Sequence, residues 1–153
     1  MAGEGIKIIT RNRKVSHEYH LLDTYEAGLV LVGSEIKSIR AGHVNLQEAF
    51  VTDTNGELWV LNMHINEYKQ AHKRGHEPLR PRKLLLHRKE INKITSEMAQ
   101  KGYTVIPTAL YLKNGRAKLE IALAKGKKLY DKRQDMRKKD DQRQMERAMR
   151  DYR

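Results

Sequence analysis

The amino-acid sequence predicts a small, mostly antiparallel β domain, all-β to α+β in class, followed by a basic C-terminal tail. Two Asn-Gly pairs, Asn55-Gly56 and Asn114-Gly115, lie between alternating apolar positions. This is the strongest short-range signal of a β-hairpin, because a type I′ turn needs positive φ at both central residues. Six or so strand-like segments and two or three short helical patterns precede Gly126, and a charged run without Gly or Pro follows it. We therefore expect a closed or nearly closed barrel of the OB type, although the strand count alone also permits an open α+β sheet.

The length of the chain fits one domain with an appendage. We expect residues 1–12 to form a flexible N-terminus, residues 13–124 the barrel, and residues 125–153 a tail that is disordered when free. The apolar run from Ile6 to Ile9 is far too short for a signal peptide or a membrane span. Cysteine is absent, which excludes disulfides and thiolate zinc sites. A cytoplasmic protein without a membrane segment fits these observations.

The first strands are expected near the start of the barrel. Residues 17–22 and 29–32 are rich in β-branched, aromatic and other apolar residues, and residues 23–28 between them read as a turn that ends in Gly28. We expect two adjacent strands here, with loose chain before them.

A short helix is expected next. Gly33-Ser34 offers an N-cap, Ile36 and Ile39 are three residues apart, and Gly42 offers a C-cap. A two-turn helix of this kind places Lys37 and Arg40 together on one face.

The remaining elements are the two hairpins and a second helix between them. The first hairpin joins residues 49–51 to 58–61, and the second joins residues 110–112 to 118–123. A polar loop over residues 69–82 separates them, followed by Leu84-Leu85-Leu86 and a helical pattern whose buried stripe is Ile91, Ile94 and Met98, ended by Gly102.

The charge of the chain favours a polyanionic partner. Lys and Arg number 31 against 19 Asp and Glu, a formal net charge of +12. Residues 125–153 hold 12 basic and 6 acidic side chains, so half of the excess lies in the tail. Nucleic acid is the first class of partner and an anionic membrane surface the second. Because aromatic residues make up only 6% of the chain, we expect recognition by charge, shape and hydrogen bonds rather than by stacking of several bases.

The tail combines charge with a latent helical pattern. Its apolar residues are too few to offset the entropy of ordering a helix in water, yet Met145, Met149 and Tyr152 have helical spacing. We expect it to fold on a partner. A membrane-bound amphipathic helix is the alternative, but the apolar face lacks Leu, Ile, Phe and Trp beyond Leu129. RNA is the better partner.

Neither a metal nor a catalytic site is expected. His17 and His20 are three apart in an expected strand, and His72 and His76 flank Gly75 in a loop. The Gly126-Lys127-Lys128 segment lacks the upstream glycine and the Ser/Thr of a phosphate-binding loop. We therefore expect no cofactor and no enzyme, and keep an RNA-processing enzyme only as the competing class.

Two groups of cations are candidates for phosphate contact. Lys37 and Arg40 are one group, for which a plain solvated face is an equal interpretation. A denser group favours phosphate contact, because converging cations displace counterions. Its members are Arg80, Arg82, Lys83, Arg88 and Lys89.

Several segments together carry a family resemblance. The chain resembles the SsrA-binding protein family, also called small protein B (SmpB), the bacterial partner of transfer-messenger RNA (tmRNA) in trans-translation. Order, spacing and terminal position all agree through most of the chain. The segments are Asn12-Arg13-Lys14 to His17-Glu18-Tyr19, Tyr25-Glu26-Ala27-Gly28, residues 35–42, residues 82–87, and Gly126-Lys127-Lys128 to Asp131-Lys132-Arg133.

The resemblance implies a ribosome-rescue factor. An OB-type barrel would bind the tRNA-like domain of tmRNA, support its charging with alanine and escort it to the A site of a stalled ribosome. The tail would become helical in the empty mRNA channel at the decoding centre of 16S rRNA. Elongation factor Tu and alanyl-tRNA synthetase would be met indirectly, through tmRNA, and the free protein is expected to be a monomer. A generic OB-type translation factor that contacts ordinary RNA is the runner-up.

The resemblance also implies site residues. Glu26 matches the family's RNA-contacting glutamate, and Leu85 and His87 lie in its second RNA-contact segment. Tyr130 stands where many members carry His, and it keeps the ability to stack but not to become cationic. With the cations above, the expected tmRNA-binding set is Glu26, Lys37, Arg40, Arg82, Lys83, Leu85 and His87. The expected ribosome-contacting set is Gly126, Lys127, Lys128, Tyr130, Asp131, Lys132 and Arg133.

Overall fold

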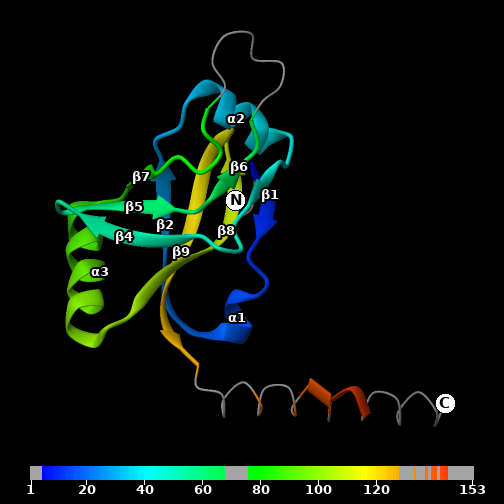
Figure 1. The fold of residues 1–153 in the computed structure, drawn as a ribbon, viewed down its shortest axis with the longest axis vertical. Coiled ribbons are helices and arrows are strands. Elements are labelled where there is room, and N and C mark those ends of the chain that lie inside the picture. Colours follow the sequence, from blue (N-terminus) through cyan, green and yellow to red (C-terminus); the bar gives the residue numbers. More distant parts are fainter. Residues whose placement is uncertain are drawn as a thin grey trace.

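The protein is described by a computed structural model. It describes residues 5–67 and 76–127, and in the tail Arg133, Arg137, Lys139, Asp140 and residues 142–144. Figure 1 shows the barrel with α2 at one end and α1 at the other, where the last strand also ends. The elements are β1 (Ile6–Arg11), α1 (Val15–Glu18), β2 (Tyr19–Leu29), α2 (Gly33–Arg40), β3 (Val44–Asn45), β4 (Phe50–Thr54), β5 (Glu57–Leu61), β6 (His64–Ile65), β7 (Arg82–Leu85), α3 (Arg88–Lys101), β8 (Thr104–Lys113) and β9 (Arg116–Gly126).

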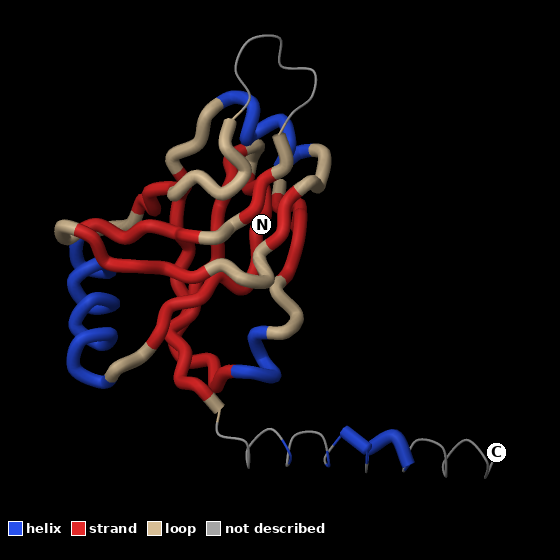
Figure 2. The backbone as a smooth tube through the Cα atoms, in the orientation of Figure 1, coloured by secondary structure: helices blue, strands red, loops and turns tan. Residues whose placement is uncertain are grey.

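The main sheet closes on itself. Its strand order is β1-β8-β4-β5-β7-β2-β9, every pairing is antiparallel, and β9 pairs with both β2 and β8. Six strands therefore form a ring, and β1 pairs with the second half of β8, beyond the point where β4 pairs with it. Figure 2 shows these strands wrapped around a common interior. The expected small antiparallel barrel of the OB type is confirmed, and the open sheet is excluded.

Both Asn-Gly turns lie where the sequence predicts them. Asn55 and Gly56 have φ of 54° and 77°, and Asn114 and Gly115 have φ of 52° and 80°. The flanking residues pair directly across each turn, Thr54 with Glu57 and Lys113 with Arg116. Positive φ at both central positions is the reason for these residue types, because Asn and Gly adopt that conformation at low cost.

The start of the chain differs from the expectation. Residues 1–12 were expected to be flexible, but Ile6–Arg11 form β1 and pair with β8 from Ile6↔Lys113 to Arg11↔Ala109. His17 and Glu18 belong to the single-turn helix α1 rather than to a strand. The stabilising partner of β1 lies about a hundred residues away along the chain, so no local pattern predicts it.

The expected turn at residues 23–28 is wrong. β2 runs without interruption from Tyr19 to Leu29, and residues 30–32 are not part of it. A bulge between Leu21 and Thr24 absorbs the irregular segment while β2 remains paired with β9. Gly28 is a strand residue that lets β7 approach closely: a Cβ there would lie 3.3 Å from the Leu85 Cβ. The turn-like composition is thus overridden by tertiary pairing.

The two expected helices are confirmed. α2 covers Gly33–Arg40, and the Val32 amide donates to the Glu35 Oε1 at 2.9 Å over its first turn. α3 covers Arg88–Lys101 and ends at Gly102, which has φ of 66°. Its stripe at Ile91 and Ile94 is buried in the barrel core, which the strands fill with aliphatic side chains. No helix within the described residues is long and apolar enough to cross a membrane.

A buried ion-pair cluster ties α2 to β7. The Arg82 and Glu35 side chains are both 0% exposed, and Arg82 Nε donates to Glu35 Oε2 at 2.6 Å. Arg80 Nη2 donates to Glu35 Oε1 at 2.5 Å. Arg82 also donates to the carbonyls of Met63 and Pro78, so its guanidinium is satisfied without solvent. Removal of one partner from such a pair leaves an uncompensated buried charge and costs about 3–5 kcal/mol.

His76 has a structural role rather than a metal-binding one. Its Nε2 lies 2.8 Å from the Ile65 carbonyl oxygen and its Nδ1 lies 2.9 Å from Ser34 Oγ. Because a carbonyl only accepts, Nε2 carries a proton and donates it to the Ile65 oxygen. His72 lies outside the described residues. Over the described ranges, no group of three or more His, Asp or Glu side chains is placed to hold a metal ion.

The Glu35 carboxyl predicts a loss of stability in acid. Burial alone raises the pKa of Glu35, but hydrogen bonds from Arg80 and the Val32 amide, with the charge of Arg82, outweigh it and lower the pKa below its ordinary 4.5. Such a group stabilises the fold above the unfolded pKa, and this stabilisation is lost as the pH falls through the folded pKa. The free energy of unfolding, measured by urea denaturation, is therefore expected to fall as the pH drops below about 5.

The Arg80→Met variant isolates this contribution. Loss of the Arg80 hydrogen bond raises the folded pKa of Glu35, so the variant should lose less free energy than the unchanged chain over the same acidic range. Lys89→Met, at an exposed position on α3, is the control and should follow the unchanged chain. Parallel pH profiles for Arg80→Met and the unchanged chain would contradict the assignment.

Candidate nucleic-acid interface

A continuous groove crosses the surface where β2, β7, α2 and the β8–β9 hairpin meet. One hollow of about 360 Å³ lies between β2, the N-terminus of α3 and β9, and it is lined by Glu26, Gly28, Leu85, Leu86, His87, Glu90 and Lys118. A second, of about 320 Å³, shares Gly28, Leu85 and Lys118 with the first and extends to Ile36, Arg40, Arg116 and Ala117, among others. We call the two together the Glu26 groove.

Strand register builds the floor of the Glu26 groove. Gly28 is paired with Leu85 of β7 on one side and with Lys118 of β9 on the other. Because side chains alternate along a strand, burial of Ala27 and Leu119 turns Glu26 and Lys118 outward. Leu85 is 51% exposed beside Gly28. The floor is thus an apolar side chain flanked by charged ones.

The Glu26 carboxylate is held by two groups from β8. Its Oε2 accepts a hydrogen bond from the Tyr111 hydroxyl, and its Oε1 lies 3.5 Å from Lys113 Nζ. The Tyr111 hydrogen bond, with the charges of Lys113 and Lys118, lowers the pKa of Glu26 against the opposing effect of partial burial. The pKa of Tyr111 is raised by burial and by the Glu26 carboxylate. At neutral pH the groove therefore presents an ionised carboxylate and a neutral phenol.

The cations around Glu26 determine what the groove can bind. Arg40, Arg116 and Lys118 line it, and Lys113 lies beside the carboxylate. Cations of this kind bind phosphate oxygens, whereas a carboxylate repels phosphate and accepts hydrogen bonds from base amines or sugar hydroxyls. The chemistry fits a nucleic-acid strand whose backbone follows the cations while one donor group meets Glu26.

Four of the seven residues expected to bind tmRNA meet in this groove. Glu26, Arg40, Leu85 and His87 all line it, and His87 is also the N-cap residue of α3. Lys37 is exposed on α2 but is not among the lining residues.

The residues of the dense cationic group expected at residues 80–89 do not share one role. Arg82 is wrong as an RNA contact, because it is fully buried against Glu35. Arg80 donates to the same carboxylate, and Arg88 donates to Glu57 Oε1 at 2.8 Å. Lys83 Nζ lies 3.9 Å from Glu57 Oε2 and does not line the groove. Much of this charge is thus matched by acids within the protein.

The sequence did not predict four residues in or beside the groove. The β8–β9 hairpin pairs Tyr111 with Lys118 and Lys113 with Arg116, which places all four on the outer face. A two-residue turn fixes this register, and the buried Leu110, Leu112 and Leu119 identify the inner face. The signal was therefore present in the alternation around Asn114-Gly115.

The expected ribosome-contacting residues begin where the barrel ends. Gly126 is the last residue of β9, and the Lys127 amide donates to the Glu18 carbonyl oxygen at 2.9 Å. Arg133 is exposed and helical, as are the described tail positions after it. Lys128, Tyr130, Asp131 and Lys132 lie outside the described residues. The role of the tail set stays a prediction.

The chain is similar to known proteins. A family model described as "SmpB protein" matches residues 9–151. The chain is 56% identical over 145 residues to the SsrA-binding protein of Bacillus cereus (strain B4264), covering 95% of this chain and 94% of that one. It is 52% identical over 148 residues to the SsrA-binding protein of Thermosynechococcus vestitus, covering 96% and 97%.

A solved structure is also similar. Its description reads "tmRNA-SmpB: a journey to the center of the bacterial ribosome". The TM-score is 0.66 and the sequence identity 40%, and the match covers 78% of this chain and 85% of that chain.

The Tyr111→Phe substitution tests the electrostatics of the groove. Loss of the hydroxyl removes the largest influence that lowers the pKa of Glu26, so this pKa should rise toward its ordinary 4.5. The measurement is the pH titration of the Glu26 carboxyl carbon by NMR. Tyr103→Phe is the matched control, because Tyr103 lies beside Lys101 rather than Glu26. An unchanged pKa of Glu26 in Tyr111→Phe would refute the hydrogen bond.

Proposed function

The chain belongs to the SmpB family, and on this premise we propose that it binds the tRNA-like domain of tmRNA, supports its alanylation and delivers it to stalled ribosomes. The activity is RNA binding, without a chemical step of its own, and it takes place in the cytoplasm, where the ribosomes are. Elongation factor Tu and alanyl-tRNA synthetase are met through the bound tmRNA.

The single observation that carries the proposal is the ionised Glu26 beside Lys113 and Lys118, in a groove that other cations also line. Arg40, Lys113, Arg116 and Lys118 supply charge for phosphates, which gives affinity without sequence information. Glu26 accepts only from N–H or O–H donors, so it selects one position and orientation of the RNA. Leu85 offers an apolar surface beside it for a sugar or a base face. A basic surface that binds RNA by charge alone would gain nothing from a carboxylate held in place by Tyr111 and Lys113.

The tail is proposed to act separately from the groove. Half of the net charge lies after residue 124, and the described positions from Arg133 onward are helical and exposed. The Lys127–Glu18 hydrogen bond fixes where the tail leaves the barrel. We assign it the empty mRNA channel and the decoding centre, with Tyr130 available for stacking and Lys132 and Arg133 for rRNA phosphates.

Removal of the charge of Glu26 tests its proposed contact with RNA. Glu26→Gln keeps the size of the side chain but loses a charged acceptor, and the affinity for the tRNA-like domain should fall about tenfold. Because no phosphate contact is lost, the slope of log affinity against log salt should stay the same. Fluorescence titration of labelled RNA at several salt concentrations measures both quantities.

Two further variants sharpen that test. Arg116→Gln should weaken binding and reduce the salt slope by about 1, as expected for one lost phosphate contact. Glu77→Gln is exposed and outside the groove, so its affinity should not change. Equal affinity of the unchanged chain for bulk tRNA and for the tRNA-like domain would favour a generic translation factor. If Glu26→Gln binds the tRNA-like domain with full affinity, the Glu26 groove is not the RNA-binding site.

A shortened chain tests the separate role of the tail. A chain that stops after Lys127 keeps the whole of β9 and the Lys127–Glu18 hydrogen bond. It should bind the tRNA-like domain with nearly unchanged affinity, yet fail to support peptide tagging on stalled ribosomes in a reconstituted translation system. Reversal of Lys132 and Arg133 to Glu in the full chain should reproduce the defect. Tagging by the shortened chain at the normal rate would contradict a separate role for the tail.

A further inference from the structure

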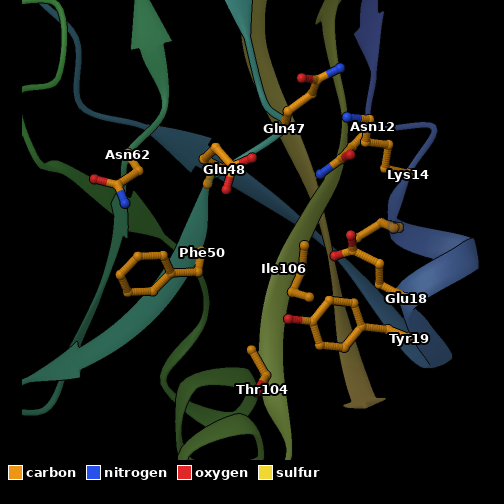
Figure 3. A pocket seen from close by; sticks show the side chains of 12 residues that line it. Asn12, Lys14, Glu18, Tyr19, Gln47, Glu48, Phe50, Asn62, Thr104 and Ile106 are labelled. Carbon is orange, nitrogen blue, oxygen red and sulfur yellow. The ribbon is translucent and has the colours of Figure 1, made fainter. Parts of the chain in front are cut away.

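A second, polar pocket lies away from the Glu26 groove, between α1, the start of β4 and the start of β8. Its volume is about 330 Å³, and it has no lining residue in common with the groove. Figure 3 shows Phe50 and Asn62 on one side of it and Asn12, Glu18 and Tyr19 on the other, with Ile106 between them. No role discussed above uses this pocket.

Asn12 is a buried polar residue in the wall of this pocket. The residue is only 6% exposed, and its Nδ2 donates to the Leu46 carbonyl at 3.1 Å and to the Pro107 carbonyl at 3.3 Å. Because carbonyls accept but do not donate, these two contacts fix the amide orientation and place Oδ1 on the other side. Oδ1 is buried and has no hydrogen-bond partner in the structure. Such an acceptor is costly to leave unmet, so the site favours a ligand with an N–H or O–H donor.

The remaining lining residues define the ligand further. Glu18 and Glu48 add two carboxylates, and Lys14 is the one cation among the residues that line the pocket. This balance disfavours a phosphate inside the pocket and favours a group with several adjacent donors. Tyr19 and Phe50 supply aromatic rings, and Ile106 supplies an apolar surface. Rings and aliphatic side chains of this kind receive a flat, neutral group.

We propose that this pocket receives an unstacked guanine base of a single-stranded RNA segment. The Watson–Crick edge of guanine presents N1–H and N2–H₂ side by side, the donor pair that a carboxylate accepts, whereas adenine and cytosine present one amine beside a ring acceptor. Glu48 or Glu18 accepts from this edge, and Asn12 Oδ1, which has no exposed surface in the free protein, accepts from it once the side chains that cover the oxygen move aside. The inference rests on the proposed RNA-binding function and adds a second, base-selective contact to it.

The surroundings allow the RNA strand to continue. An adjoining depression of about 410 Å³ shares Gln47, Glu48 and Asn62 with the pocket and extends to His64 and to Leu79, which is 50% exposed. It is mostly apolar in character, which suits the face of a neighbouring base or sugar. A guanine in the pocket thus has space for the next nucleotide of a strand beside it.

The test uses the full-length, isotope-labelled chain and three free nucleotides. Guanosine monophosphate should shift the Asn12 side-chain amide and Ile106 methyl NMR signals saturably. Inosine monophosphate, which lacks only the N2 amine, should bind about tenfold more weakly, and adenosine monophosphate more weakly still. This comparison changes the ligand and leaves the fold intact. Equal affinity for guanosine and inosine monophosphate, or no shift at Asn12, would overturn the proposal.

Variants locate the contact in the protein. Glu48→Gln should lower the affinity for guanosine monophosphate about tenfold, while Glu67→Gln, exposed and outside the pocket, should not. A chain that stops after Lys127 should bind guanosine monophosphate as before, and a large gain in its affinity would make the tail the occupant and overturn the proposal. If the unchanged chain fails to bind the tRNA-like domain of tmRNA, the proposed function fails while the guanine result still stands or falls by itself.

Discussion

The pairing of β9 with two partners at once is the interaction on which the rest of the structure depends. One edge of β9 is paired with β2 and the other with β8, and these two ladders close the ring of strands. They also bring Glu26 from β2 next to Tyr111 and Lys113 from β8, although these residues are far apart in the sequence. The same strand ends at Gly126, so the register of one element sets both the groove and the exit of the tail.

A contrast between two carboxylates shows how burial divides structure from function. Glu35 is fully buried and matched by Arg80 and Arg82, so its charge stabilises the junction of α2 and β7 and is hidden from any partner. Glu26 is 39% exposed, and its remaining acceptor capacity faces solvent in a cationic groove. Both have lowered pKa values and cationic neighbours. Exposure makes the difference: the charge of Glu35 is structural, whereas Glu26 is the one that we propose as a binding group.

The parts of the fold that local chemistry determines could be predicted from the sequence. The Asn-Gly turns, the α3 stripe and the charge asymmetry of the tail need no tertiary information. β1 and the uninterrupted β2 could not be predicted, because distant strands hold them in place. Arg82 is expected at the surface because it lies in a cluster of cations. The carboxylate that it binds, Glu35, is 47 residues away, so no local pattern predicts the buried pair. The alternation of β7 indicates this burial, because Arg82 lies on the same inner face as the buried Leu84, whereas Leu85 is exposed.

The most direct test of the central claim maps the surface that the RNA covers. The tRNA-like domain of tmRNA would be added to the isotope-labelled full-length chain, and the NMR signals that shift or broaden would be assigned to residues. The account predicts that the strongest changes fall on Glu26, Leu85, His87, Arg116 and Lys118, which line the Glu26 groove. Saturable binding that leaves these five residues unperturbed while others respond would contradict it.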